Sequence, residues 1–302
     1  MATPRAVVVH RRSELDELLD RHGTRGQAEF FLRTRGRTMA SVQDRHDAQA
    51  EALAAVRAAV PAEWRRGDVE RGDLHRFGFE PDDVCLVVGQ DGLVANVAKY
   101  LAAQPVIGVD PEPGRNPGVL VRHRARAVAG LVRVAGVGDA RIDALTMVTA
   151  TLDDGTRLDA LNEVFVGHAS HQSARYRLTV PATDGAARTE ERQSSSGLIV
   201  ATGTGATGWA ASIAHDRGAP QGALPAPVDR RLAWFVREAW PSPATGTALT
   251  GGALAAGQEL TVVVESDALV VFGDGLEADR LTATWGQAVT VALADRALHL
   301  VA

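Results

Sequence analysis

The chain has 302 residues, of which 45% are hydrophobic, and a formal net charge of −5. This length favours two domains, and the charge gives no reason to expect nucleic acid or a membrane as a partner. The single cysteine, Cys85, lies in an apolar run and allows no internal disulfide, which fits a cytoplasmic protein.

The first part of the chain alternates strand and helix patterns. Apolar runs predict strands over residues 6–10, 84–88 and 106–109, and helical spacing predicts helices over 47–60 and 94–101. Ser13 has the pattern of a helix cap, and the charged stretch 65–83 is expected to be a loop. This alternation predicts a Rossmann-like α/β domain with a parallel sheet over residues 1–125.

The remainder, residues 126–302, is predicted to be a mostly β, β-sandwich-like domain that binds substrate, with its last strands able to return to the first domain. Two polar stretches, 185–195 and 219–227, are expected to be connectors. The predicted strands cover residues 145–152, 158–166, 175–180, 198–201, 260–265, 269–272, 289–293 and 297–301.

The first candidate site follows the strand at 84–88 and reads Gly89-Gln90-Asp91-Gly92-Leu93. A glycine-rich turn between a strand and a helix brings backbone N–H groups close to an anion. Asp91 would lie at the carboxyl end of a parallel strand, where open α/β sheets bind ligands. There a carboxylate can accept a proton from an attacking hydroxyl or help to hold Mg²⁺. An ordinary turn is the alternative.

The second candidate site is the turn 202–209, which contains the pattern G-x-G-x-x-G of dinucleotide-binding loops. That fingerprint also needs a following strand that ends in an acid, and none is evident here, so we discount an oxidoreductase. The hydroxyls of this turn remain candidates for ligand contact, although they can equally cap a helix. The hydroxyls are those of Thr202, Thr204 and Thr207.

Three further sets of side chains are weaker signals. Asn162 and Glu163 form an adjacent amide and carboxylate that could hold a ribose diol. His168 and His171 lack the further ligands of a metal site, so we predict no metal held by the protein alone. Arginines in the run 122–126 could bind phosphate, or form a solvated connector.

Taken together, these motifs resemble the NAD kinase family, which belongs to a larger group with diacylglycerol kinases and phosphofructokinases. The family's Gly-Gly-Asp-Gly-Thr is similar to residues 89–93, its Asn-Glu pair to 162–163, and its Asp-Gly-Leu-Ile strand with the following Ser/Thr-rich turn to 196–209. Order and spacing agree from about residue 84 to the C-terminus. Residues 106–110 and the turn 272–275 resemble two further family segments.

The resemblance implies ATP-dependent phosphorylation of NAD to NADP with Mg²⁺, and a homodimer or homotetramer. It makes Asp91 the catalytic carboxylate that activates the 2′-hydroxyl, in a cleft between the two domains. Phosphate binding would involve Gly89, Gln90, Gly92, Leu93, Arg122 and Arg124. Substrate binding would involve Asn162, Glu163, Ser196, Thr202, Thr204, Gly205, Thr207, Gly208 and Trp209.

Several positions depart from the family pattern. Gln90 replaces a glycine, Leu93 a threonine, Ser196 an acid and Trp209 a tyrosine, and residues 114–120 differ as well. Two alternatives therefore stay open. One is a kinase of the same architecture that phosphorylates the hydroxyl of another nucleotide, nucleoside or metabolite. The other is a catalytically degenerate protein that senses a dinucleotide.

Overall fold

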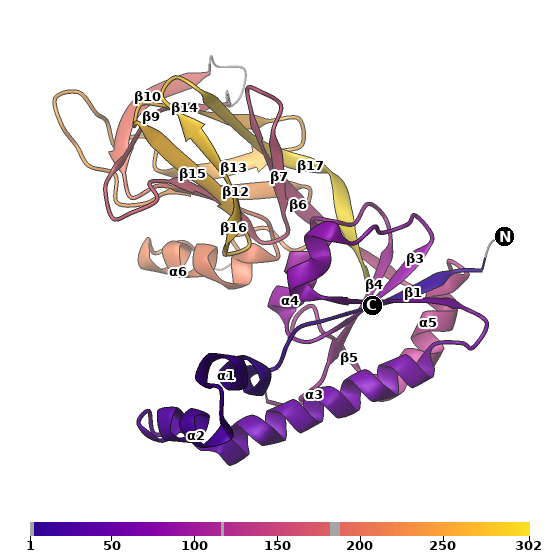
Figure 1. The fold of residues 1–302 in the computed structure, drawn as a ribbon. Helices are drawn as coiled ribbons and strands as arrows, with labels where there is room; N and C mark the ends of the chain where they lie inside the picture. Colours follow the sequence, from indigo (N-terminus) through magenta and orange to yellow (C-terminus); the bar gives the residue numbers. More distant parts are fainter. Residues whose placement is uncertain (1–2, 116–117, 182–187, 221) are drawn as a thin grey trace. The chain divides into compact units, whose positions relative to one another are not determined.

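The computed structural model describes residues 3–115, 118–181, 188–220 and 222–302, which form two compact units (Figure 1). Unit 1 consists of Met1–Asp143 and His299–Ala302, and unit 2 of Ala144–Leu298. Residues 116 and 117 of the divergent stretch, and 185–187 of the first expected connector, lie outside the described residues.

Unit 1 contains a parallel sheet. Its strands follow the order β2 (Arg65–Glu70), β1 (Arg5–His10), β3 (Asp83–Val88), β4 (Pro105–Asp110) and the end of β17 (Ala288–Val301). A two-residue strand, β5 (His123–Arg124), pairs with the end of β4. All six residues of β3 are buried, which is the pattern of a central strand covered on both faces.

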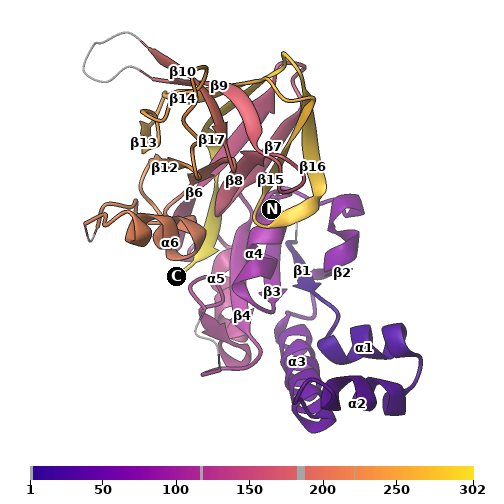
Figure 2. The ribbon, with the colours of Figure 1, turned by 90° about the vertical axis from the view of Figure 1, so that its left-hand side faces the viewer.

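Helices cover this sheet. Apolar side chains of α3 (Met39–Ala59) and α5 (Val128–Gly136) share one core with alternate residues of β1, β3 and β4. Helix α4 (Asp91–Ala98) also packs against β3, and it contacts the 3-10 helix η1 (Arg71–Arg76). A separate cluster joins α1 (Glu14–His22), α2 (Arg25–Arg33) and the start of α3, side by side in Figure 2.

Unit 2 is mostly β and has a core shared by two sets of antiparallel strands. The first set contains β10 (Thr189–Ser195), β9 (Ala174–Val180), β14 (Glu259–Val264), β17, β6 (Ile142–Leu152) and β7 (Arg157–Ala160). The second has the order β13 (Gly251–Ala255), β12 (Arg231–Val236), β11 (Leu198–Ala201), β8 (Glu163–Gly167), β15 (Ala268–Gly273) and β16 (Leu276–Thr284).

The helix of unit 2, α6 (Trp209–Asp216), follows β11 through the short η3 (Gly205–Thr207). Its side chains pack on the face of the second sheet that points away from the shared core. The first unit also contains the 3-10 turn η2 (Ala125–Ala127) ahead of α5. Among the described residues, none of the helices is both long and apolar enough to cross a membrane.

Several sequence predictions are confirmed. The chain is an α/β protein with a mostly β second part, and the strands expected at 6–10, 84–88, 106–109, 175–180 and 198–201 are present. Ser13 caps α1 through a complete capping box with Asp16. The loop expected over 219–227 contains no helix or strand among its described residues.

Other predictions are wrong, and each error has a physical reason. Residues 65–70 form β2 although they are charged, because an edge strand needs only one buried side chain here, that of Val69. Residues 189–195 likewise form the edge strand β10. The first long helix begins at Met39 rather than at 47, capped by Thr38. The strand expected over 158–166 breaks at Leu161–Asn162 into β7 and β8, whereas 288–301 is one strand.

Candidate functional site

The carboxyl ends of β3 and β4 border a pocket of about 290 Å³ in unit 1. Residues that follow these strands form most of its wall. The lining residues are Gly89, Gln90, Asp91, Gly92, Asp110, Pro111, Glu112, Gly118 and Val121. Because open α/β sheets bind ligands at this edge, the first predicted motif lies where its proposed role requires. We call this cavity the phosphate pocket, after the role predicted for residues 89–93.

The amino terminus of α4 faces this pocket. Gln90 is the N-cap of the helix, and its side chain makes no capping hydrogen bond. Nothing lies within 4 Å of the position that a Cβ atom on Gly92 would take, so the first turn is open. Free N–H groups and the positive end of the helix dipole both favour an anion there.

Asp91 is hydrogen-bonded to the loop that follows β4. Its Oδ2 accepts the N–H of Val119 at 2.8 Å, and its Oδ1 accepts those of Leu120 at 2.9 Å and Val121 at 3.0 Å. A carboxylate has about four acceptor positions, so Oδ2 keeps capacity for one further donor or cation. The side chain therefore anchors the loop and also lines the pocket.

Gly118 permits this close approach. A Cβ atom at that position would lie 2.7 Å from Asp91 Oδ1 and 2.4 Å from a methyl carbon of Val121. Arg122 supports the same loop, since its Nε donates to the carbonyl of Val119 at 2.8 Å and its guanidinium pairs with Asp143. The loop thus lies against Asp91 because a glycine stands there.

Some residues predicted to bind phosphate lie elsewhere. Leu93 is buried and packs beneath Gly89, so it supports the turn. Arg122 is engaged with the loop, and Arg124 lies in β5 with an exposed side chain. Neither arginine is among the described residues that line the phosphate pocket.

A second cavity, of about 340 Å³, adjoins the phosphate pocket, since Gln90 and Glu112 line both. We call it the arginine pocket. Beyond those two residues it is lined by Arg11, Arg12, Ser13, Glu14, Glu17, Arg45 and Gln49. The sheet order reverses between β1 and β3, because β2 flanks β1 on one side and β3 on the other. The residues after β1 and β3 therefore meet at a topological switch point, where ligands bind in such sheets.

In unit 2, the turn after β11 packs against the break between β7 and β8. Thr202 is buried, its hydroxyl donates to the carbonyl of Leu161 at 2.6 Å, and it accepts the N–H of Thr204 at 3.1 Å. A Cβ atom on Gly205 would lie 2.2 Å from the carbonyl oxygen of Asn162, so only glycine allows this contact. The structure thus brings the second turn and the predicted Asn162–Glu163 pair together.

Three polar side chains at this place have no hydrogen-bond partner among the described residues. They are the hydroxyl of Thr204, which is buried, and the half-buried side chains of Asn162 and Glu163. Buried polar groups are normally satisfied in native proteins, so the unsatisfied hydroxyl of Thr204 points to a ligand or water. This set is the strongest indication of a binding site in unit 2.

Burial raises the pKa of Glu163 to about 7, with a further contribution from the charge of Asp274. Asp274 lies in the turn between β15 and β16 with a positive φ of 55°. Its carboxylate accepts the N–H groups of Leu161 at 3.0 Å and Asn162 at 2.6 Å. Asp274 therefore fixes the backbone that presents Glu163, and it adds a second carboxyl group to the site.

The other predicted substrate residues lie along β11 and α6. Trp209 stacks on Phe165 with ring centroids 5.8 Å apart, and the guanidinium of Arg237 lies 4.9 Å from the centre of its ring. Ser196 is exposed at the opposite end of β11 from Thr202, and its N–H donates to the carbonyl of Arg237. Thr207 and Gly208 are exposed in the connection to α6.

The structure also shows the surroundings of the dinucleotide-like turn and of His168. The turn with the dinucleotide fingerprint follows β11, which is antiparallel to both its neighbours, so it lacks the βαβ context of that fingerprint. His168 lies in an exposed stretch, where its Nδ1 accepts the N–H of Ser170.

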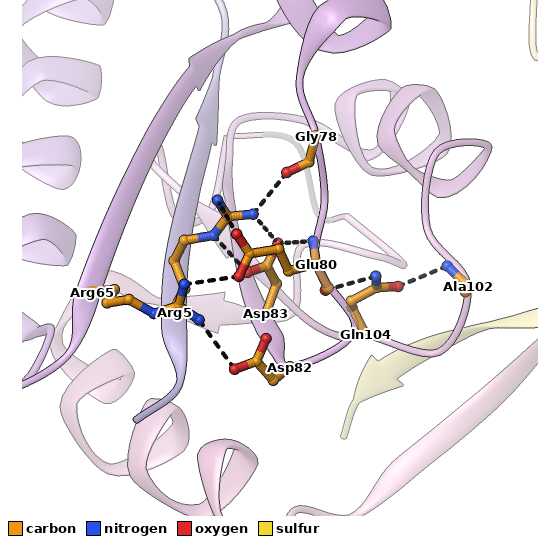
Figure 3. Close-up of polar contacts among 8 residues, drawn as sticks. All are labelled: Arg5, Arg65, Gly78, Glu80, Asp82, Asp83, Ala102 and Gln104. Atoms are coloured by element: carbon orange, nitrogen blue, oxygen red, sulfur yellow. Dashed lines mark hydrogen bonds and ion pairs between the residues drawn. The ribbon is translucent and has the colours of Figure 1, made fainter. Parts of the chain in front are cut away.

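Within the described residues, one group of acids lies close enough to hold a metal: Glu80, Asp82 and Asp83, at the amino ends of the strands (Figure 3). Arg5 binds both oxygens of the buried Asp83 at 2.7 Å, and Arg65 pairs with Glu80 and Asp82. Arginines neutralise these carboxylates, so the cluster joins three strands through ion pairs.

Sequence reasoning did not select Arg11, Arg45, Glu112 or Asp274 as site residues. For Arg11, the sequence offered one signal, the basic pair Arg11-Arg12 directly after the first strand. For Asp274, the signal was an Asp-Gly turn. Arg45 lies in the middle of a helix, where the sequence carries no such signal.

Comparison with known proteins adds no identification. No known family model matches the sequence, and no curated protein matches it significantly.

Proposed function

We propose that the protein transfers the terminal phosphoryl group of ATP to the 2′-hydroxyl of NAD, as its resemblance to NAD kinases implies. The observation that carries this proposal is the phosphate pocket, where an open helix terminus and a carboxylate lie at the carboxyl edge of a parallel sheet. The Rossmann-like and β-sandwich-like descriptions of the two units belong to the same proposal.

In this proposal the first turn of α4 binds donor phosphates. The hydroxyl oxygen of the acceptor attacks the terminal phosphorus, ADP leaves, and Asp91 accepts the hydroxyl proton through Oδ2. The pocket fits Mg²⁺, because that ion is bound through one or two carboxylates together with phosphate oxygens. Asp110 is the residue that would hold it while Asp91 accepts the proton, and the ion would neutralise charge on the phosphates.

The acceptor would be bound by unit 2. Asn162, Glu163 and Thr204 offer an amide, a carboxyl group and a hydroxyl that form no side-chain hydrogen bond to a described residue, which suits the diol of a ribose. The proposal requires that unit 1 and unit 2 serve the same reaction. We also expect the family's homodimer or homotetramer, which light scattering would refute by giving the mass of one subunit.

The direct test is to incubate the purified protein with ATP, Mg²⁺ and NAD, and to detect NADP with an NADP-specific dehydrogenase. Asp91→Asn and Asp91→Ala should abolish NADP formation. Because Asp91 also anchors the loop, each variant needs a melting curve. Asp143→Asn is the matched control, since it removes the ion pair that supports this loop through Arg122 and leaves the pocket residues in place.

One observation favours a second candidate, a dinucleotide sensor without activity. Both oxygens of Asp91 already accept backbone N–H groups, which is a structural use of this carboxylate. A sensor would bind NAD or ATP in calorimetry and form no NADP, with or without the substitution Asp91→Asn. An enzyme would form NADP and lose that activity in the same variant.

A further inference from the structure

The boundary between the phosphate pocket and the arginine pocket is formed by two side chains, Gln90 and Glu112. Glu112 is held in place, because Arg45 contacts its Oε1 at 3.3 Å and Arg115 its Oε2 at 3.1 Å. The carboxamide of Gln90 has no hydrogen bond to a described residue and caps nothing. Gln90 is therefore the adjustable part of this boundary.

The arginine pocket offers cations to a ligand that reaches it. The side chain of Arg11 forms no hydrogen bond or salt bridge with a described residue, although its charge contributes, after those of Arg37 and Arg45, to lowering the pKa of Glu14. The carbonyl of Arg11 is held by Gln49 at 2.6 Å. Glu14 is paired with Arg37 and Arg45, and Glu112 with Arg45 and Arg115. Glu17, the third acid of the arginine pocket, has no ion pair with a described residue. Arg12 is paired with Asp20. Arg11 is thus the cation available for an anion.

We propose that Gln90 is a specificity-determining residue, which limits the length of the phosphate chain in the phosphate pocket by closing it from the arginine pocket. While the side chain of Gln90 is in place, a phosphate chain bound in the phosphate pocket ends at this residue. Without it, the two cavities become one, and a longer chain extends from the first turn of α4 to Arg11. This inference rests on the proposed function in one respect: the phosphate pocket binds phosphate.

The test measures the affinity of the 302-residue protein for inorganic pyrophosphate and inorganic tetraphosphate by calorimetry in the presence of Mg²⁺, since carboxylates also line the phosphate pocket. Gln90→Gly removes the side chain and keeps a residue that is well accepted at a helix N-cap, so the fold should persist. We expect its affinity for tetraphosphate to rise about tenfold, which is the effect of one added charge-assisted hydrogen bond. Its affinity for pyrophosphate should change less than about twofold.

Two matched variants separate the causes. Gln90→Leu keeps the bulk and removes the amide, so it should bind both anions as the unaltered protein does. Arg11→Ala combined with Gln90→Gly should lose the gain for tetraphosphate, because the longer chain then meets no free cation. These outcomes together support a steric boundary at Gln90.

Other outcomes overturn the inference. A gain of equal size for both anions, no gain in Gln90→Gly, or the same gain in Gln90→Leu would each show that Gln90 does not set chain length. Those results would leave NADP formation, and so the proposed function, intact. If neither the unaltered protein nor any variant binds either anion, the phosphate pocket itself is refuted, and the proposed function loses its basis as well.

Discussion

Replacing Glu163 by glutamine should make unit 2 more stable at neutral and alkaline pH. Burial, with Asp274 nearby, raises the pKa of Glu163 from 4.5 to about 7 in the folded protein. Folding therefore favours the protonated carboxyl group, and ionising it costs free energy. The difference between these pKa values corresponds to roughly 3 kcal/mol at full ionisation, which partial exposure of the side chain reduces to about 1–3 kcal/mol.

The direction of the pH dependence follows from the raised pKa. Below pH 4.5 the group is protonated in both the folded and the unfolded chain, so it does not disfavour folding. As the pH rises from 4.5 to about 7, the unfolded chain ionises first and the folded protein loses stability. Above pH 7 the folded protein bears the full free-energy cost of ionising Glu163. The variant Glu163→Gln has no group to ionise at this position, so its stability is not reduced in this way.

Urea unfolding at a series of pH values would measure this difference. Four of the five tryptophans, residues 209, 234, 240 and 285, belong to unit 2, so a Trp64→Phe background makes the fluorescence specific for that unit. The two proteins should have equal stability near pH 4.5 and diverge as the pH rises. A difference that stays constant with pH would refute the reasoning, because the polar group alone would then explain it.

Three other predictions concern individual side chains. Gly118→Ala should destabilise unit 1 by about 1–3 kcal/mol, since its Cβ would overlap Asp91 and Val121, whereas Gly92→Ala should leave urea unfolding unchanged. Asp274→Ala should lower the stability of unit 2 by about 2–4 kcal/mol, because it leaves two backbone N–H groups without an acceptor; a smaller loss than in Asp274→Asn would contradict this. The thiol of Cys85 is fully buried, which raises its pKa, so a thiol reagent should label it only after denaturation; rapid labelling of the native protein would show the core to be open.

The elements that were predicted correctly are those whose local pattern and burial agree. The strand at 84–88 has an uninterrupted apolar run, and its six residues are all buried. The edge strands β2 and β10 were not predicted, because their side chains are mostly polar and do not form an apolar strand pattern. Solvent and ion pairs satisfy their charged side chains at a sheet edge.

The sequence selects candidate site residues but does not predict their contacts. Asp91 meets N–H groups 28–30 positions further along the chain, and nothing near Asp91 in the sequence announces that loop. The pKa of Glu163 likewise depends on burial and on Asp274, which is distant in sequence. Local sequence patterns select candidate side chains. Long-range packing decides whether a carboxyl group is hydrogen-bonded within the protein and whether it is protonated.

The most direct test of the proposed function is the formation of NADP from NAD, ATP and Mg²⁺ by the unaltered protein, compared with Asp91→Asn. We expect NADP with the unaltered protein, none with Asp91→Asn, and activity near the original level with Asp143→Asn. NADP formation that persists in a folded Asp91→Asn would contradict the role of this carboxylate. No NADP from the unaltered protein would contradict NAD as the acceptor.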